Sequence, residues 1–182
     1  YERIFKNHEY WRLWTALFVH ADLEHLLSNL LLFLPLAFIL SGYFGLVIFP
    51  VVGIFMGAVV NAIAVQYMPE TVSLIGISGL VYWMGAVWLT LYILIDRRRS
   101  LKRRLAVSLF LTVLLFIPET YRPQVSYLSH FIGYILGIFS GLAVYGFRRK
   151  EFESAEVIEW IEEPEDPIDL TTESPNVSAH LE

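Results

Sequence analysis

The chain has 182 residues, of which 56% are hydrophobic and only 17% are charged, with a formal net charge of −5 at pH 7. The charges are bunched, which leaves apolar stretches long enough to cross a hydrocarbon core of roughly 30 Å. Cysteine is absent, which excludes disulfide bonds and thiolate chemistry. The sequence therefore predicts an all-α fold, a polytopic membrane helix bundle.

Five apolar segments each approach the ~20 residues that a tilted helix needs to span a bilayer. They are residues 26–42, 44–68, 77–95, 101–117 and 125–147. The fourth is the weakest, because its uninterrupted apolar run starts only at Leu105, after three basic residues whose charged ends must reach the interface. Pro35 and Pro50 fall within spans, where neighbouring helices can satisfy the freed carbonyl groups.

Nine of the 13 basic residues lie in two clusters, within residues 97–104 and 148–150. Basic residues at the ends of apolar spans indicate cytoplasmic loops, so both clusters are expected in the cytoplasm and no nucleic-acid partner is predicted. Five crossings counted back from a cytoplasmic carboxyl end place Tyr1 outside the cell. The chain begins with Tyr and shows no signal peptide, so we expect a further span upstream of it. The predicted location is the plasma membrane, as a multi-pass protein.

This topology divides the chain into three regions. Residues 1–25 form an outer loop that leads into the first visible span, residues 26–147 form the membrane core, and residues 148–182 form a basic stop followed by an acidic tail. From Glu151 onward the chain contains no Lys or Arg and has three prolines, which is typical of a disordered cytoplasmic tail. A solvated tail without a specific role is favoured over a partner-binding tail.

Polar residues within apolar spans are costly unless they pair or line a wet cavity, so they indicate a site. His25 and Asn29 are four residues apart and project from one helix face, where they can serve one ligand. His20 lies off that face, and a structural, hydrogen-bonding role near the outer mouth is favoured for it. The HExxH spacing of a zinc site is not met, so no metal is predicted.

Ser78 lies at the start of its span between Gly76 and Gly79. Glycines allow a tight turn and the close approach of another chain, and the first N–H groups of a helix point toward a developing anion. The arrangement suits a nucleophile beside an oxyanion pocket, although the motif taken alone favours a small-residue packing interface between membrane helices. Tyr82 is one turn further on the same face and can contact the base that serves Ser78.

Gly133, Gly137 and Gly141 form a ridge of small residues on which another helix can pack closely, and His130 lies one turn before Gly133. If the neighbour is the serine-bearing span, a His130 ring nitrogen can reach Ser78 Oγ at the ~2.6–3.2 Å that base catalysis requires. Both residues lie toward the outer ends of their spans. A serine with a histidine indicates acyl-transfer chemistry.

Together these residues resemble the rhomboid family of intramembrane serine proteases over about residues 10–149. The matching motifs, in chain order, are Trp11-Arg12, His20-x4-His25-x3-Asn29, Gly76-Ile77-Ser78-Gly79 with Tyr82, and His130-x2-Gly133-x3-Gly137. The resemblance implies that Ser78 is the nucleophile and His130 the general base. It also implies an oxyanion hole formed by His25, Asn29 and the Ser78 N–H group.

The same resemblance implies that Tyr82 packs against His130 and that Trp11 and Arg12 belong to an outer-leaflet loop that braces the fold. The family core usually has six spans, and the one expected before Trp11 is missing from this chain. No acidic residue lies in the membrane halves of these helices, so a Ser/His dyad without an orienting carboxylate is expected.

The sequence thus predicts an intramembrane serine endopeptidase that needs no cofactor and cleaves transmembrane segments of membrane proteins near the outer face. Its expected partners are transmembrane protein substrates and the lipid bilayer, and its oligomeric state is open. Residues 118–127 are a candidate lid. The alternative is a non-catalytic rhomboid-like chaperone or adaptor, whose hallmark would be loss of Ser78 or His130. A transporter would need broken helices and coupling-ion ligands.

Overall fold

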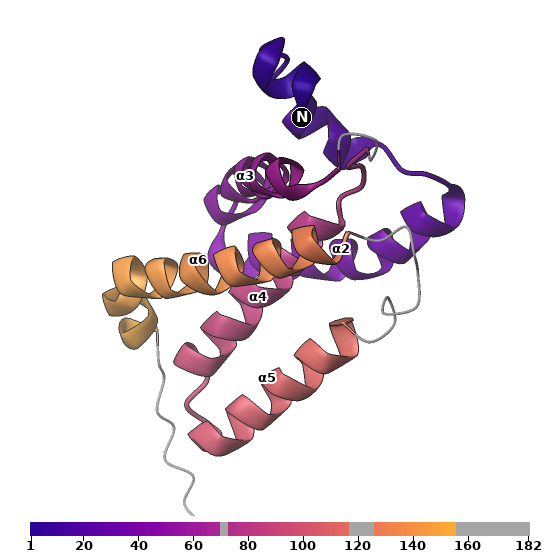
Figure 1. The fold of residues 1–182 in the computed structure, drawn as a ribbon. Helices are drawn as coiled ribbons and strands as arrows, with labels where there is room; N and C mark the ends of the chain where they lie inside the picture. Colours follow the sequence, from indigo (N-terminus) through magenta and orange to yellow (C-terminus); the bar gives the residue numbers. More distant parts are fainter. Residues whose placement is uncertain (70–72, 117–125, 156–182) are drawn as a thin grey trace, which may run out of the picture.

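The computed structural model describes residues 1–69, 73–116 and 126–155, without the side chains of residues 115 and 116, and these residues contain helices and no strand. The helical elements are η1 (Glu2–Lys6), α1 (Arg12–Thr15), η2 (Ala16–Phe18), α2 (Leu23–Phe44), η3 (Val47–Val52), α3 (Gly53–Ala64), η4 (Val65–Tyr67), α4 (Ser78–Ile95), α5 (Leu101–Phe116) and α6 (Tyr127–Ser154). Figure 1 shows how the longer helices are arranged around α4.

Four segments of the described residues are long and apolar enough to cross a membrane: Leu23–Phe44, Val47–Tyr67, Ser78–Ile95 and Tyr127–Ser154. They correspond to four of the five predicted spans. The remaining one forms α5, which has only 16 residues and is not among these four; residue 117, its predicted end, lies outside the described residues. The prediction of an all-α membrane bundle is confirmed.

Two predicted spans differ in detail from the observed helices. The second is interrupted near its start, where Phe49 is extended at φ −142° and ψ 129°, because the residue before a proline is pushed out of the helical region. The last continues beyond its predicted end to Ser154, and an ion pair of 2.8 Å between Arg149 and Glu153 supports this extension. Residues 156–182, most of the predicted tail, lie outside the described residues.

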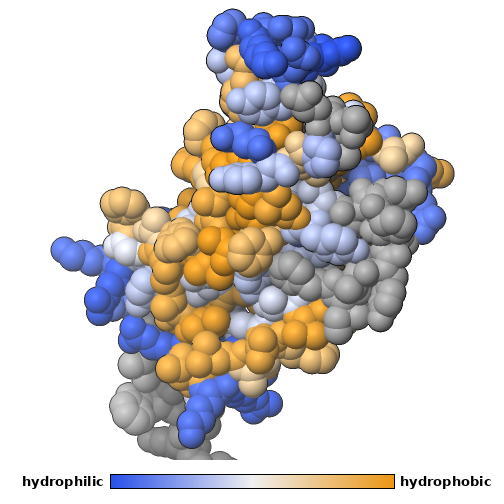
Figure 2. Space-filling model, in the orientation of Figure 1, coloured by the Kyte–Doolittle hydropathy of each residue, from blue (hydrophilic) through white to orange (hydrophobic). Residues whose placement is uncertain are grey.

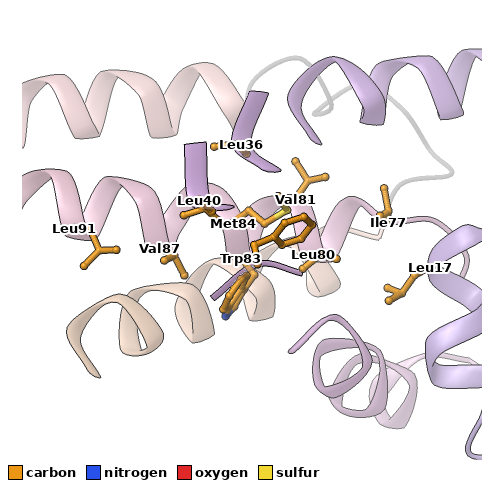
Figure 3. Close-up of a cluster of buried hydrophobic side chains, with 11 residues drawn as sticks. Leu17, Leu36, Leu40, Ile77, Leu80, Val81, Trp83, Met84, Val87 and Leu91 are labelled. Carbon is orange, nitrogen blue, oxygen red and sulfur yellow. The ribbon is translucent and has the colours of Figure 1, made fainter. Parts of the chain in front are cut away.

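Helix α4 is the buried centre of the bundle. In the most apolar stretch of α4, 67% of the residues are buried, compared with 17% in that of α2. Figure 3 shows the apolar cluster around it, in which Trp83 is only 1% exposed. Trp83 Nε1 donates a hydrogen bond of 3.0 Å to Ser140 Oγ on α6. The indole therefore fills the core with its carbon atoms and joins two helices with its nitrogen.

The backbones of α4 and α6 touch at the glycine ridge. A Cβ on Gly133 would lie 2.2 Å from the carbonyl oxygen of Gly79, and a Cβ on Gly137 would lie 2.5 Å from that of Trp83. Such an approach is open only to glycine, and it gives dispersion contacts where lipid offers no hydrophobic driving force. The ridge therefore packs on the serine-bearing helix.

The surface of the bundle is apolar where lipid would cover it. One stripe of exposed apolar side chains runs along α2 and consists of Leu23, Leu27, Leu31, Leu34 and Phe38. In Figure 2 an apolar surface lies between hydrophilic residues at the N-terminal end and at the opposite end of the molecule. Buried polar side chains lie inside instead, including Asn29, Asn61 and His130. This distribution suits a bilayer as solvent.

We predict that Gly133→Ala lowers the free energy of unfolding by about 1–3 kcal/mol, because the added methyl group would overlap a backbone carbonyl that cannot move aside. Gly146→Ala on the same helix is the matched control, since nothing lies within 4 Å of its Cβ position. This control should be neutral or stabilising by up to about 1 kcal/mol. Denaturant titration in micelles measures both variants, and equal effects would contradict the close packing of α4 and α6.

Candidate active site

The first turn of α2 is capped by Asp22, whose Oδ1 accepts a hydrogen bond of 2.7 Å from the backbone N–H of His25. Asn29 follows one turn later and is 4% exposed. Its Nδ2 donates to the carbonyl oxygen of His25 at 3.0 Å. The cap thus places His25 and Asn29 on one face at the beginning of the helix.

Gly76 presses the segment before α4 against this face. A Cβ on Gly76 would lie 2.9 Å from His25 Cε1 and 4.0 Å from Asn29 Nδ2, and the residue has φ +102°, which L side chains rarely adopt. Its N–H donates to the carbonyl oxygen of Ala16 at 2.9 Å. Glycine is therefore required at this position by both conformation and space. The contact joins the His25–Asn29 pair to the segment that leads to Ser78.

Ser78 is the first residue of α4. The residue before it, Ile77, has no side chain that can cap the helix, and its carbonyl oxygen accepts from Val81 N–H at 3.0 Å. The first N–H groups of a helix have no intrahelical acceptor and lie at the positive end of the helix dipole. A negative charge that forms beside Ser78 would therefore be stabilised there.

His130 reaches the same region from α6. It is 1% exposed, and its ring stacks on that of Tyr82 with centroids 4.1 Å apart and an interplanar angle of 13°. Tyr82 lies one turn after Ser78 on the same face of α4. The Cβ position of Gly79 lies 3.5 Å from Ser129 Cβ, so the first turns of α4 and α6 are in contact.

The predicted polar residues lie at the beginnings of three helices: His25 and Asn29 on α2, Ser78 on α4 and His130 on α6. The contacts of Gly76 with His25, of Gly79 with Ser129 and of Tyr82 with His130 join these three helix beginnings. Within the described part of the chain, Ser78 Oγ and His130 are not joined by a hydrogen bond. Catalytic hydrogen bonds are often long before substrate binds and shorten in the complex.

His20 lies at the outer edge of this group. Its ring meets that of His25 edge-on, with centroids 5.2 Å apart and an angle of 73°. Burial and the neighbouring His25 lower the pKa of His20 from its ordinary value, and a backbone hydrogen bond at Phe18 opposes this shift. His20 thus packs against His25 with its neutral form favoured.

Trp11 and Arg12 belong to the short segment around α1. The Arg12 guanidinium lies 4.5 Å from the centre of the Trp11 ring and forms an ion pair with Glu9. This segment is tied to α3 by Asn61, whose Nδ2 donates to Leu13 O at 2.9 Å. Asn61 lies outside the predicted motifs, although an asparagine within an apolar span is the same kind of signal as Asn29.

Two further expectations concern ligands and the lid. Among the described residues, no three His, Asp or Glu side chains are grouped so that they could hold a metal ion. Most of the candidate lid, residues 118–125, lies outside the described part of the chain.

Comparison with known families gives a match. The family model described as the Rhomboid domain matches residues 7–147, which is well over half of the chain and includes all the site residues described above. No curated protein and no solved structure matches the chain.

Proposed function

The chain belongs to the rhomboid family, and from this premise we propose that it is a serine endopeptidase that cleaves transmembrane segments near the outer face. Membership by itself places the protein among intramembrane proteases and their inactive relatives in the bilayer. The observation that supports catalysis is the convergence of Ser78, His130, His25 and Asn29 from three helices. An inactive relative has no chemical need for this combination.

In the proposed mechanism Ser78 Oγ attacks the scissile carbonyl carbon and transfers its proton to a ring nitrogen of His130. A serine hydroxyl is a weak nucleophile until a positioned base accepts its proton. The stack on Tyr82 restricts rotation of the imidazole, because the two rings are nearly parallel. The tetrahedral intermediate then collapses, the scissile C–N bond breaks, and the imidazolium of His130 protonates the leaving amine. Water attacks the acyl-enzyme with His130 again as the base, which releases the carboxyl product and regenerates Ser78. Tyr82 is thus a positioning residue.

The oxyanion hole would be formed by the Ser78 N–H group, His25 and Asn29. Asn29 Nδ2 carries two protons, of which one serves the carbonyl oxygen of His25, so the second remains for the oxyanion. Donors held in place before the reaction are worth roughly 3–4 kcal/mol each in a water-poor site. No metal or cofactor takes part in this scheme.

The proposed topology follows from the basic clusters, with residues 97–104 and 148–150 in the cytoplasm and the outer loop of residues 1–25 on the opposite side. Residues 26–147 are the membrane core, and the basic stop and acidic tail of residues 148–182 are cytoplasmic. The plasma membrane is the proposed location. The site at the beginning of α4 then opens outward, where the substrates would be cut.

We predict that Ser78→Ala abolishes both cleavage of a transmembrane substrate and labelling by a fluorophosphonate, because both need the activated hydroxyl. His130→Ala should lose nearly as much, since the hydroxyl then stays protonated at neutral pH. Ser41→Ala on α2 is the control and should keep both activities, because the Ser41 hydroxyl donates to the carbonyl oxygen of Ala37 in its own helix.

Labelling and cleavage distinguish the enzyme from its rival. A wild-type protein that folds and binds transmembrane segments but takes up no fluorophosphonate would instead be a chaperone or adaptor. Cleavage that persists in the Ser78→Ala protein would rule out the proposed nucleophile.

For Asn29→Ala we predict that labelling survives while turnover falls roughly ten- to a thousandfold, since one oxyanion donor is lost. Asn61→Ala is the matched control, because Asn61 is also 4% exposed and also donates to a backbone carbonyl. Both variants should lose stability, measured by denaturant titration, but only Asn29→Ala should lower kcat. A similar kcat for the two variants would argue against Asn29 as an oxyanion donor.

The topology is testable because the chain contains no cysteine, so single cysteines need no background removal. A cysteine at Ser100, which is exposed between α4 and α5, should react with a membrane-impermeant maleimide only from the cytoplasmic side. A cysteine at the exposed Asn7 should react only from outside. The reverse pattern would overturn the orientation and place the site on the cytoplasmic side.

A further inference from the structure

A cleft of about 600 Å³ lies between the C-terminal half of α4 and α5. In Figure 1, α5 follows α4 after a short loop and runs back in the opposite direction. Its lining consists of Trp88, Tyr92, Asp96, Arg98, Arg99, Arg103, Val107 and Leu111. None of these residues belongs to the candidate active site. The proposed protease chemistry leaves the cleft without a role.

The cleft is amphipathic along its length. Its charged residues all lie in the loop after α4 or in the first turn of α5. Leu111 lies eight residues beyond Arg103 on α5, and Trp88 lies eight residues before Asp96, which corresponds to about 12 Å along either helix. The ionic mouth therefore leads into an apolar interior that extends toward the hydrocarbon region.

The mouth carries an excess of positive charge. Arg98 binds Asp96 through two hydrogen bonds, Nε to Oδ1 at 2.9 Å and Nη2 to Oδ2 at 3.0 Å. The bonds from Arg98 lower the pKa of Asp96 from its ordinary value, so the carboxylate stays ionised and is neutralised within the pair. Arg99 and Arg103 form no ion pair with any described residue.

The first turns of α5 are held against α4, so Arg103 lies at a defined position. Its neighbour Arg104 bonds α4 directly, because its Nη1 donates to the carbonyl oxygen of Ile93. Ser100 Oγ accepts from the backbone N–H of Arg103 at 3.4 Å. The guanidinium group of Arg103 is thus carried by a helix that is bonded to α4.

We propose that this cleft binds an anionic glycerophospholipid from the adjacent leaflet, with the phosphate between Arg99 and Arg103 and an acyl chain along Trp88, Val107 and Leu111. Guanidinium groups match phosphate oxygens in geometry and charge, and basic pockets between membrane helices suit lipid headgroups. A free phosphate ion would leave the apolar interior empty. A zwitterionic choline headgroup would bring a further cation beside a mouth that already carries an excess of positive charge.

Trp88 provides the reporter for the test. The full chain is reconstituted in phosphatidylcholine vesicles that contain a small fraction of a lipid with brominated acyl chains, which quench tryptophan fluorescence. This lipid is either brominated phosphatidylglycerol or brominated phosphatidylcholine. The fluorescence of a Trp88→Phe protein is subtracted, so that the remaining signal comes from Trp88. The brominated phosphatidylglycerol should occupy the cleft roughly thirtyfold more tightly than the brominated phosphatidylcholine, about 1 kcal/mol for each arginine. Equal quenching of Trp88 by the two lipids in the wild-type protein would overturn the proposal.

The double variant Arg99→Gln/Arg103→Gln should remove this preference. Lys102→Gln/Lys150→Gln is the matched control, because it removes two positive charges that are exposed and do not line the cleft. The control should keep the preference for phosphatidylglycerol. If both double variants lost this preference equally, the lipid would be attracted by surface charge in general and the proposed site would be overturned.

Two further measurements keep the result interpretable. Unchanged quenching by brominated phosphatidylcholine in the arginine variant shows that Trp88 keeps its depth. If that quenching changes, the double variant Arg99→Lys/Arg103→Lys is used in place of the glutamine variant. The lysine variant should keep part of the preference for phosphatidylglycerol, and complete loss of this preference would contradict phosphate binding. If inorganic phosphate displaced the brominated phosphatidylglycerol, the cleft would be a simple anion site and the proposal of a lipid site would be overturned.

Discussion

The structure depends on one contact, the approach of the α4 and α6 backbones at Gly79 and Gly133. A side chain at Gly133 would push the helices apart, since the Cβ position of Gly133 is only 2.2 Å from the carbonyl oxygen of Gly79. In a bilayer this contact cannot be replaced by apolar burial, because lipid solvates apolar side chains as well as protein does. The first turns of both helices are therefore held together by shape.

The polar residues follow from this contact. Once α4 and α6 touch, Tyr82 and His130 face each other, and Ser78 lies one turn away on the same helix face. The other half of the site depends on a second glycine, Gly76, which lets the loop before α4 reach His25. Two close backbone approaches thus gather side chains that would each be costly alone in hydrocarbon. Membership of the rhomboid family is consistent with a site that is built from these few residues.

Much of this arrangement could be predicted from the sequence, because hydropathy marks the spans and the small-residue ridge indicates close packing. What could not be predicted depends on tertiary context. The interruption at Phe49 has a local cause in Pro50, but whether a proline bends or breaks a membrane helix is decided by its neighbours. The continuation of α6 to Ser154 rests on ion pairs within a segment whose composition resembles a disordered tail.

The roles of individual polar residues are harder still to predict, as the two buried asparagines show. Asn29 and Asn61 are each 4% exposed, and each donates to a backbone carbonyl oxygen. The acceptor of Asn61 is Leu13, 48 positions away in the chain, so that bond ties separate segments together. The acceptor of Asn29 is His25 in the same helix, so this bond does not tie separate segments together. The side-chain nitrogen of Asn29 also lies 4.0 Å from the Cβ position of Gly76. This position beside Gly76, in the segment that leads to Ser78, supports the proposed role of Asn29 as an oxyanion donor.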